Sequence, residues 1–408
     1  MIPQTFLEEA KSLQNILISH RRYLHTHAET GFDLNETLAY VKKELSKMGY
    51  EPKDCGKAGV MVLAGGQKKG PVFLIRGDMD ALPMEEKAEI DFPSVNGRMH
   101  ACGHDLHTAM MLGAARLLKN HEDEIPGTVK LMFQPAEEIF EGALDMIQAG
   151  ILENPHVDAA MMIHVIAKMP LPSGSVVVAS PGISAPGADF FTIQVNGKGC
   201  HGSMPETGVD PIHAAAHILI ALEEITSREL ALHDRAVLTI GTINAGTAPN
   251  IIPDTAVMSG SLRTFDEETR QFIKERMVQI TEGIAKTFRA EASVTFGSGC
   301  PALYNDADLC LCVESYVREL LEQEQVFTSS HVNHSDASNK PSKSGGSEDF
   351  AYISQKVPSV MLSFAAGQPE KGYCYPQHHP MVLFDEEILF KGSAIYAYTA
   401  IRWLEHHS

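Results

Sequence analysis

The chain has 408 residues, of which 44% are hydrophobic and 21% charged, so we expect two domains rather than one. Its formal net charge of −19 excludes nucleic-acid binding, because no lysine and arginine cluster is dense enough for a cationic surface. Seven cysteines without framework spacing indicate a reducing compartment. No signal peptide is visible, and no apolar run approaches the roughly 20 residues of a membrane span. We expect a cytoplasmic protein with no nucleic-acid or membrane partner.

The first part of the chain alternates helix and strand patterns. Apolar residues at helical spacing predict helix over residues 4–48 and again over 107–118. Four apolar runs around the second helix predict strands over 60–64, 71–75, 128–133 and 159–163. This alternation predicts an α/β domain with a mostly parallel central sheet flanked by helices.

The pattern changes after about Ala185 and returns near residue 300. The predicted elements between these points are, in order, 189–195, 210–225, 236–243, 256–262, 267–288 and 292–296. Their β-α-β-β-α-β order predicts a smaller α+β domain with helices on one face of its sheet. Residues 301–408 resume mixed helix and strand. We therefore expect one domain made of 1–184 and 300–408, with 185–299 as an insertion.

Five segments are rich in metal-ligating side chains. The most informative, Met99 to His107, holds a thiol, three imidazoles and a carboxylate, and its Cys102 and His104 can reach one divalent transition ion. The other four segments are 77–80, 136–138, 163–164 and 377–380. Cys-x-His alone is weak evidence, because buried cysteine and histidine are often packing residues. We expect every segment just past the carboxyl end of a strand, where open α/β sheets place their sites. Together they indicate a metal-dependent hydrolase.

Two pairs of carboxylates suit hydrolysis. Glu137 and Glu138 are adjacent, so in an extended segment one can bind metal while the other stays free as a base. Taken alone, the pair is better explained as solvated acids at a helix start. Asp78 and Asp80 face one way on an extended chain, and either can hydrogen-bond a ligand histidine. A turn that uses aspartate for local hydrogen bonds explains them equally well.

Four further side chains are candidates. His164 ends an apolar strand and is a possible metal ligand. His201 lies in a glycine-rich loop of the inserted section, where it can donate to a substrate oxygen across a cleft. Asn250 and Arg263 lie in the same section. An arginine at a strand end can clamp a carboxylate bidentately, although a surface ion pair is the commoner case.

Together these segments resemble the amidohydrolase branch of the aminoacylase/carboxypeptidase family of metallopeptidases. That branch includes hippurate hydrolases, indole-acetyl-amino-acid hydrolases and N-acetyl-diaminopimelate deacetylases. The matching segments are 22–29, 78–83, 102–109, 133–138, 199–205, 246–253, 346–350 and 378–380. The chain departs from the usual pattern at Ala28, Cys200, Gly202-Ser203 and Val382. None of these changes removes a ligand, but those near His201 leave the acyl-group preference open.

The resemblance implies a binuclear site with Glu137 as general acid/base. The implied metal ligands are Cys102, His104, Glu138, His164 and His378, the last being the first histidine before His-Pro. The resemblance also implies that the insertion is a lid that dimerises, with His201 reaching the partner subunit's active site to stabilise the oxyanion. Asn250 and Arg263 match positions that hold substrate, Arg263 its free carboxylate. Zinc, manganese, nickel and cobalt all remain possible metals.

The expected function is hydrolysis of the amide bond of N-acyl-L-amino acids to a carboxylate and a free amino acid. A metal-activated water would attack, with Glu137 taking and returning its proton. One alternative is a dipeptidase or carboxypeptidase with the same binuclear site. Another is a non-catalytic binding protein with the same fold, which the intact ligand set disfavours. We expect a homodimer through the inserted domain.

Overall fold

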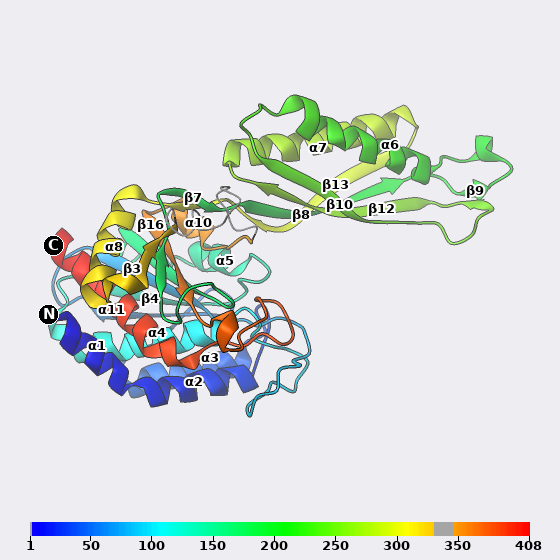
Figure 1. Ribbon diagram of the computed structural model, residues 1–408. Coiled ribbons are helices and arrows are strands. Elements are labelled where there is room, and N and C mark those ends of the chain that lie inside the picture. Colours follow the sequence, from blue (N-terminus) through cyan, green and yellow to red (C-terminus); the bar gives the residue numbers. More distant parts are fainter. Residues whose placement is uncertain (1, 330–345) are drawn as a thin grey trace. The chain divides into compact units, whose positions relative to one another are not determined.

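The computed structural model describes residues 2–329 and 346–408. They form two compact units (Figure 1). Unit 1 holds the described residues of Met1–Ser184, Tyr304–Lys343 and Tyr352–Ser408, and unit 2 those of Ala185–Leu303 and Ser344–Ala351. Residues 330–345 of the last predicted section lie outside the described residues.

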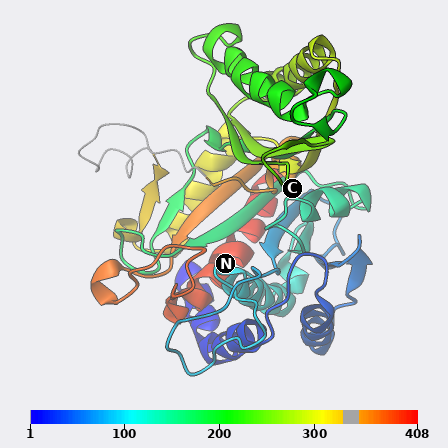
Figure 2. The ribbon, with the colours of Figure 1, turned by 90° about the vertical axis from the view of Figure 1, so that its right-hand side faces the viewer.

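Unit 1 is built on an eight-stranded sheet with the strand order β1-β2-β4-β3-β5-β16-β6-β15. The strands in that order are Lys53–Cys55, Gly59–Gly65, Thr128–Gln134, Val72–Asp78, Ala159–Ile166, Ser359–Ala365, Val176–Val178 and Val326–Thr328. The four central strands are parallel, and Figure 2 shows β16, in orange, beside β5, in green. β2 and β6 join this group antiparallel. The predicted mostly parallel central sheet is confirmed.

Helices flank this sheet. They are α1 (Pro3–Ser12), α2 (Gln14–Thr26), α3 (Asn35–Lys47), α4 (His104–Asn120), α5 (Gly142–Gln148), α8 (Ala307–Leu320), α10 (Ala351–Ser354) and α11 (Leu389–His407). α4 is buried on nearly all sides and packs against α11 and α2, as expected for a helix in the middle of a large core.

The helical pattern predicted over residues 4–48 is divided among three helices, a division that the prediction did not give. α1 and α2 meet at Leu13, and residues 27–34 separate α2 from α3. Gly31 has a positive φ of 57° there, a conformation that suits glycine. The Glu29 carboxylate then accepts the backbone N–H groups of Glu36 and Thr37 at 3.1 and 2.9 Å. It therefore satisfies the free donors that begin α3.

The carboxyl edge of the central strands carries only some of the ligand-rich segments. Asp78 is the last residue of β3, but His164 lies inside β5, because pairing with β16 continues to Ile166. Cys102 and His104 lie at the start of α4, and His378 follows β16 by a long loop. The expectation that every ligand-rich segment directly follows a strand is therefore wrong for three segments, 99–107, 163–164 and 377–380.

Unit 2 is a four-stranded antiparallel sheet, ordered β10-β12-β8-β13, with two helices on one face (Figure 1). Its strands in that order are Ala236–Ala245, Thr255–Thr264, Gly187–Asn196 and Glu291–Cys300, and its helices are α6 (Pro211–Glu224) and α7 (Glu267–Thr287). The short strands β9 (Cys200–His201) and β11 (Ile251–Ile252) pair with each other. The predicted smaller α+β fold is confirmed. Among the described residues, none of the helices has the length and apolarity needed to cross a bilayer.

Candidate metal centre

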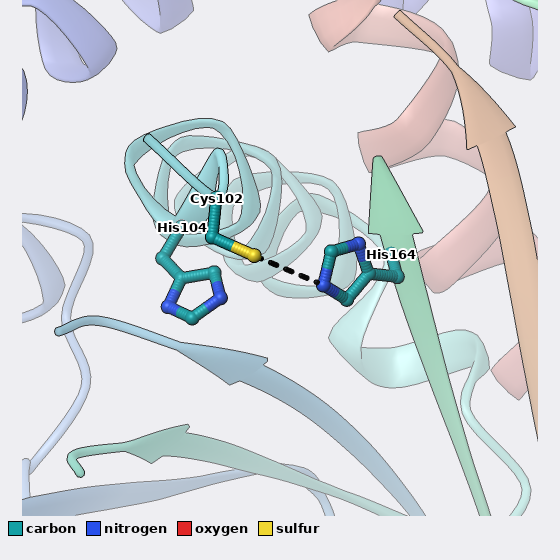
Figure 3. Close-up of side chains that lie close together, drawn as sticks. All are labelled: Cys102, His104 and His164. Carbon is teal, nitrogen blue, oxygen red and sulfur yellow. Dashed lines mark hydrogen bonds between the residues drawn. The ribbon is translucent and has the colours of Figure 1, made fainter. Parts of the chain in front are cut away.

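Cys102, His104 and His164 converge at the amino end of α4 (Figure 3). Their donor atoms lie within 4.8 Å of one another, and the Cys102 thiol is 3.6 Å from Nε2 of His164. Gly103 connects the first two with a φ of 94°, and a Cβ there would lie 2.4 Å from Cγ2 of Val165. Only glycine allows the chain to pass β5 this closely.

Glu137, Glu138 and His378 join the same cluster. The donor atoms of Cys102, Glu138 and His378 form one close group, and those of His104, Glu137 and Glu138 form another. His378 Nε2 lies 3.5 Å from Glu138, and His104 Nε2 lies 3.9 Å from Glu137. The five predicted metal ligands and the predicted general base therefore come from four distant segments into one place.

The donor set fits a metal ion. His104 Nε2 and Glu138 Oε1 are buried and have no hydrogen-bond partner within the described part of the chain. Such atoms normally find a partner, because burying them unpaired costs about 1–3 kcal/mol each. Burial raises the pKa of Glu138 to about 7 and, together with the Glu138 charge, raises the pKa of the Cys102 thiol well above its usual value. A divalent cation would reverse both effects, since it binds the deprotonated forms.

The two glutamates lie in a turn, so the extended segment expected for them is wrong. Ala136 and Phe140 bracket the turn with positive φ values of 56° and 55°. Each oxygen of the Asp80 carboxylate accepts one backbone N–H, from Glu137 at 3.0 Å and from Glu138 at 3.1 Å. Two successive amides can meet one carboxylate only if the chain turns. Strained backbone of this kind is found where structure serves a site.

Asp78 lies 3.6 Å from Nε2 of the predicted ligand His104, but its side chain hydrogen-bonds other residues. Its carboxylate accepts from His107 Nδ1 at 2.5 Å and from Arg76 at 2.6 Å. Although burial opposes its charge, Arg76 holds the pKa of Asp78 well below the usual range. The ligand candidate His104 instead donates from Nδ1 to the backbone oxygen of Asp80 at 2.9 Å. This assigns its Nε2, which has no hydrogen-bond partner among the described residues, to the metal side.

The peptide groups of Val165 connect three ligand-bearing segments. Its N–H donates to His107 Nε2 at 2.8 Å, and its C=O accepts from Gln377 Nε2 at 2.8 Å and from His164 Nδ1 at 2.7 Å. Both nitrogens of His107 are thus occupied, so His107 positions its neighbours and is not itself a ligand. Sequence reasoning missed the roles of His107 and Gln377, although both lie in the segments singled out as ligand-rich.

The loop that carries His378 has a further attachment. The backbone N–H of His378 donates to the carbonyl of Ala101 at 3.0 Å, and His378 itself has a φ of 62°. A histidine in this region of φ is uncommon. The bond holds His378 next to the Cys102 segment despite the long separation in sequence.

The remaining candidates lie in unit 2. His201 and Asn250 are neighbours, since Gly202 donates to the Asn250 carbonyl at 2.8 Å, and the exposed His201 ring contacts the Ser203 hydroxyl at 2.7 Å. Arg263 is on β12, its guanidinium 5.5 Å from the Phe190 ring, and it forms no ion pair with a described carboxylate. It lies eight residues beyond Thr255 along β12, roughly 26 Å at ~3.3 Å per residue.

Comparison with known proteins places the chain in a family. Residues 74–402 match the model of peptidase family M20/M25/M40. N-acetyl-L-cysteine deacetylase of Bacillus subtilis is 36% identical, over 97% of this chain and 89% of that protein. An Arabidopsis thaliana protein, IAA-amino acid hydrolase ILR1-like 2, is 33% identical, over 99% of this chain and 89% of its own length.

A solved structure is also similar along its whole length. It is the Bacillus subtilis YXEP protein, described as a dinuclear metal-binding peptidase from the M20 family, with a TM-score of 0.77 and 34% identity. The match covers 97% of this chain and 99% of that one. The chain thus belongs to peptidase family M20/M25/M40. The predicted resemblance to its amidohydrolase branch is confirmed, and so is the assignment as a metal-dependent hydrolase of linear amides.

Proposed function

We propose that this enzyme hydrolyses N-acyl-L-amino acids to a carboxylate and a free amino acid. The observation that carries the proposal is the cluster in which Glu137 lies beside buried donor atoms of His104 and Glu138 that lack hydrogen-bond partners among the described residues. Two divalent cations would be held by Cys102, His104, Glu138, His164 and His378. Bound there, such ions supply Lewis-acid chemistry, lowering the pKa of water and polarising the amide carbonyl.

Glu137 is the general acid/base in this proposal. Its carboxylate takes a proton from the attacking water and returns it to the amide nitrogen as the C–N bond breaks. The residue is 5% exposed, and the turn that Asp80 holds fixes its backbone. A base that is kept in place before substrate arrives needs little reorganisation during the reaction.

Residues of unit 2 complete the proposed site. The His201 imidazole donates to the carbonyl oxygen as negative charge develops there, Asn250 holds the substrate, and the Arg263 guanidinium binds its free carboxylate. The guanidinium pairs with no carboxylate among the described residues, where its contacts are the Phe190 ring and the Leu262 carbonyl. Recognition of a free carboxylate distinguishes an N-acyl amino acid from a simple amide.

The proposal includes a homodimer formed through unit 2. His201 and Asn250 lie near the start of β12 and Arg263 near its other end, a span too long for one small substrate. In a dimer the distance within one chain no longer matters, because His201 of the partner subunit can contact the substrate that this chain's Arg263 binds. The outer strand β10 is an unpaired edge in the described structure and exposes Val237 and Ile243. Such edges readily pair with a second copy.

A substrate panel tests the proposal. The metal-loaded enzyme should hydrolyse N-acetyl and N-benzoyl amino acids faster than unblocked dipeptides, and a chelator should stop the reaction. The competing function is a peptidase on the same site, which the description of the YXEP protein favours. If unblocked dipeptides are cleaved faster than N-acyl amino acids, the enzyme is a peptidase and the proposal is wrong. Metal analysis of the purified protein would choose among zinc, manganese, nickel and cobalt. The cytoplasmic location expected from the cysteine count belongs to this proposal too.

A further inference from the structure

Helix α6 of unit 2 presents two histidines one helical turn apart. His213 and His217 are spaced i and i+4, so their side chains lie on the same face of the helix. Both are exposed, and their ring centroids are 4.7 Å apart. The helix packs into unit 2 through other residues, namely Pro211, Ala214, Ala215, Ile218 and Leu222. The pair is therefore not needed for the core.

Phe288, directly after α7, holds both rings. Its centroid is 4.7 Å from that of His217 in a stacked arrangement and 5.0 Å from that of His213 at 90°. Within the described part of the chain, neither imidazole has a hydrogen bond or ion pair, since the bond of His213 to the Asp210 carboxylate comes from its backbone N–H. Two neighbouring imidazoles with restricted rotamers and free nitrogens lose little conformational entropy on binding a shared ligand.

We propose that His213 and His217 form an additional transition-metal site on unit 2. An ion bound ~2 Å from one nitrogen of each ring needs centroids roughly 4.5–5 Å apart, and the observed 4.7 Å fits. Two histidines at i and i+4 are also the spacing by which helices present imidazoles to zinc. A site with two imidazoles and open positions for water takes Cu²⁺ most tightly, then Ni²⁺ or Zn²⁺.

Retention on immobilised Ni²⁺ tests this site, because a resin-bound ion reaches surface imidazoles, while the donors proposed in unit 1 are already occupied in the metal-loaded enzyme. We expect His213→Ala and His217→Ala, each in the untagged metal-loaded enzyme, to elute at a lower imidazole concentration than the natural protein. The matched control is His233→Ala, which removes a single exposed imidazole from the same unit and should not change elution. Phe288→Leu keeps both donors and should lose part of the retention.

A Cu²⁺ titration of the metal-loaded enzyme, followed by calorimetry and electron paramagnetic resonance, gives a second readout. The natural protein should bind one more Cu²⁺ per chain than the double variant His213→Ala/His217→Ala, and the nitrogen-coordinated signal should be lost in that variant. Turnover of an N-acyl amino acid before Cu²⁺ is added should be the same in both. Equal Cu²⁺ binding by the two proteins, or elution of His217→Ala together with the natural protein, overturns the proposal.

Discussion

Val165 donates its backbone N–H to Nε2 of His107, at 2.8 Å. The bond joins the strand that carries His164 to the helix that begins with His104. Because the other ring nitrogen of His107 donates to Asp78, the imidazole has one defined tautomer and one orientation. The spacing between two candidate ligands therefore depends on a residue that is not itself a ligand.

We expect His107→Leu to weaken metal binding about 10–100-fold, the usual effect of removing a group that supports metal ligands. The leucine would leave the Val165 N–H and the Asp78 carboxylate without their partner, so His164 would lose its fixed position. Metal content after dialysis against graded chelator measures the change. His156→Leu, at an exposed histidine, is the control, and equal metal retention by the two variants would contradict this role.

Glu137→Gln should lower kcat by about 10²–10⁴-fold, the usual contribution of a general base. The amide keeps the size of the side chain but cannot accept the proton. Metal content should stay close to that of the natural protein, since Glu137 is not among the proposed ligands. Glu141→Gln, four residues away at an exposed position, should keep normal turnover. Near-normal kcat in Glu137→Gln would refute the mechanism.

Asp80→Asn tests the turn that holds the glutamates. An asparagine has one acceptor oxygen where aspartate has two, so one of the two N–H groups from Glu137 and Glu138 loses its partner. We expect a loss of about 1–3 kcal/mol in stability and a fall in kcat with metal content largely kept. Urea unfolding and steady-state kinetics measure the two effects, with Asp33→Asn at an exposed site as control. An unchanged kcat would show that catalysis does not depend on the two hydrogen bonds from the turn to the Asp80 carboxylate.

The candidate site could be foreseen from sequence where chemistry is concentrated in short segments. Cys102 and His104 are two residues apart, and Glu137 and Glu138 are adjacent, so residue types and spacing were enough to single them out. The hydrogen bonds that bring these segments together join residues far apart in sequence, so they could not be predicted in this way. The bond from Gln377 to the carbonyl of Val165 joins residues 212 positions apart, and no local pattern encodes it.

The errors in the predicted elements have the same origin. The prediction of helix over residues 4–48 marked no boundary between α2 and α3, because hydrophobic periodicity does not register the Glu29 carboxylate that binds the first N–H groups of α3. β5 was expected to stop at Ile163, yet pairing with β16, from the far end of the chain, carries it on to Ile166. The turn at Glu137 depends on Asp80 in the same way. Each feature depends on a specific hydrogen-bond partner that hydrophobic periodicity does not detect, and for β5 and the Glu137 turn that partner lies far away in sequence.

The stability of unit 1 should fall in mild acid partly because of His20. This histidine is 4% exposed and bonds to the Tyr40 hydroxyl through Nδ1 at 2.8 Å. Burial lowers its pKa below the usual 6.5, against the opposing charge of Glu44. The folded state thus binds fewer protons than the unfolded chain just below pH 6.5, so the free energy of unfolding falls as the pH drops.

His20→Gln removes this titration while keeping a polar side chain near Tyr40. At pH 7.5 we expect the variant to be less stable, because it packs and bonds less well. The difference should shrink as the pH falls to 5.5, since only the natural protein then loses stability through His20. Urea unfolding of both proteins at the two pH values, with the same metal loading, measures this. His121→Gln is the comparison, because Glu9 and Glu124 raise the pKa of this half-buried histidine despite partial burial. Its protonation stabilises the fold, so the stability difference between the natural protein and His121→Gln should grow as the pH falls. If the difference in free energy of unfolding between the natural protein and His20→Gln stays constant or grows in acid, protonation of His20 does not destabilise the folded protein.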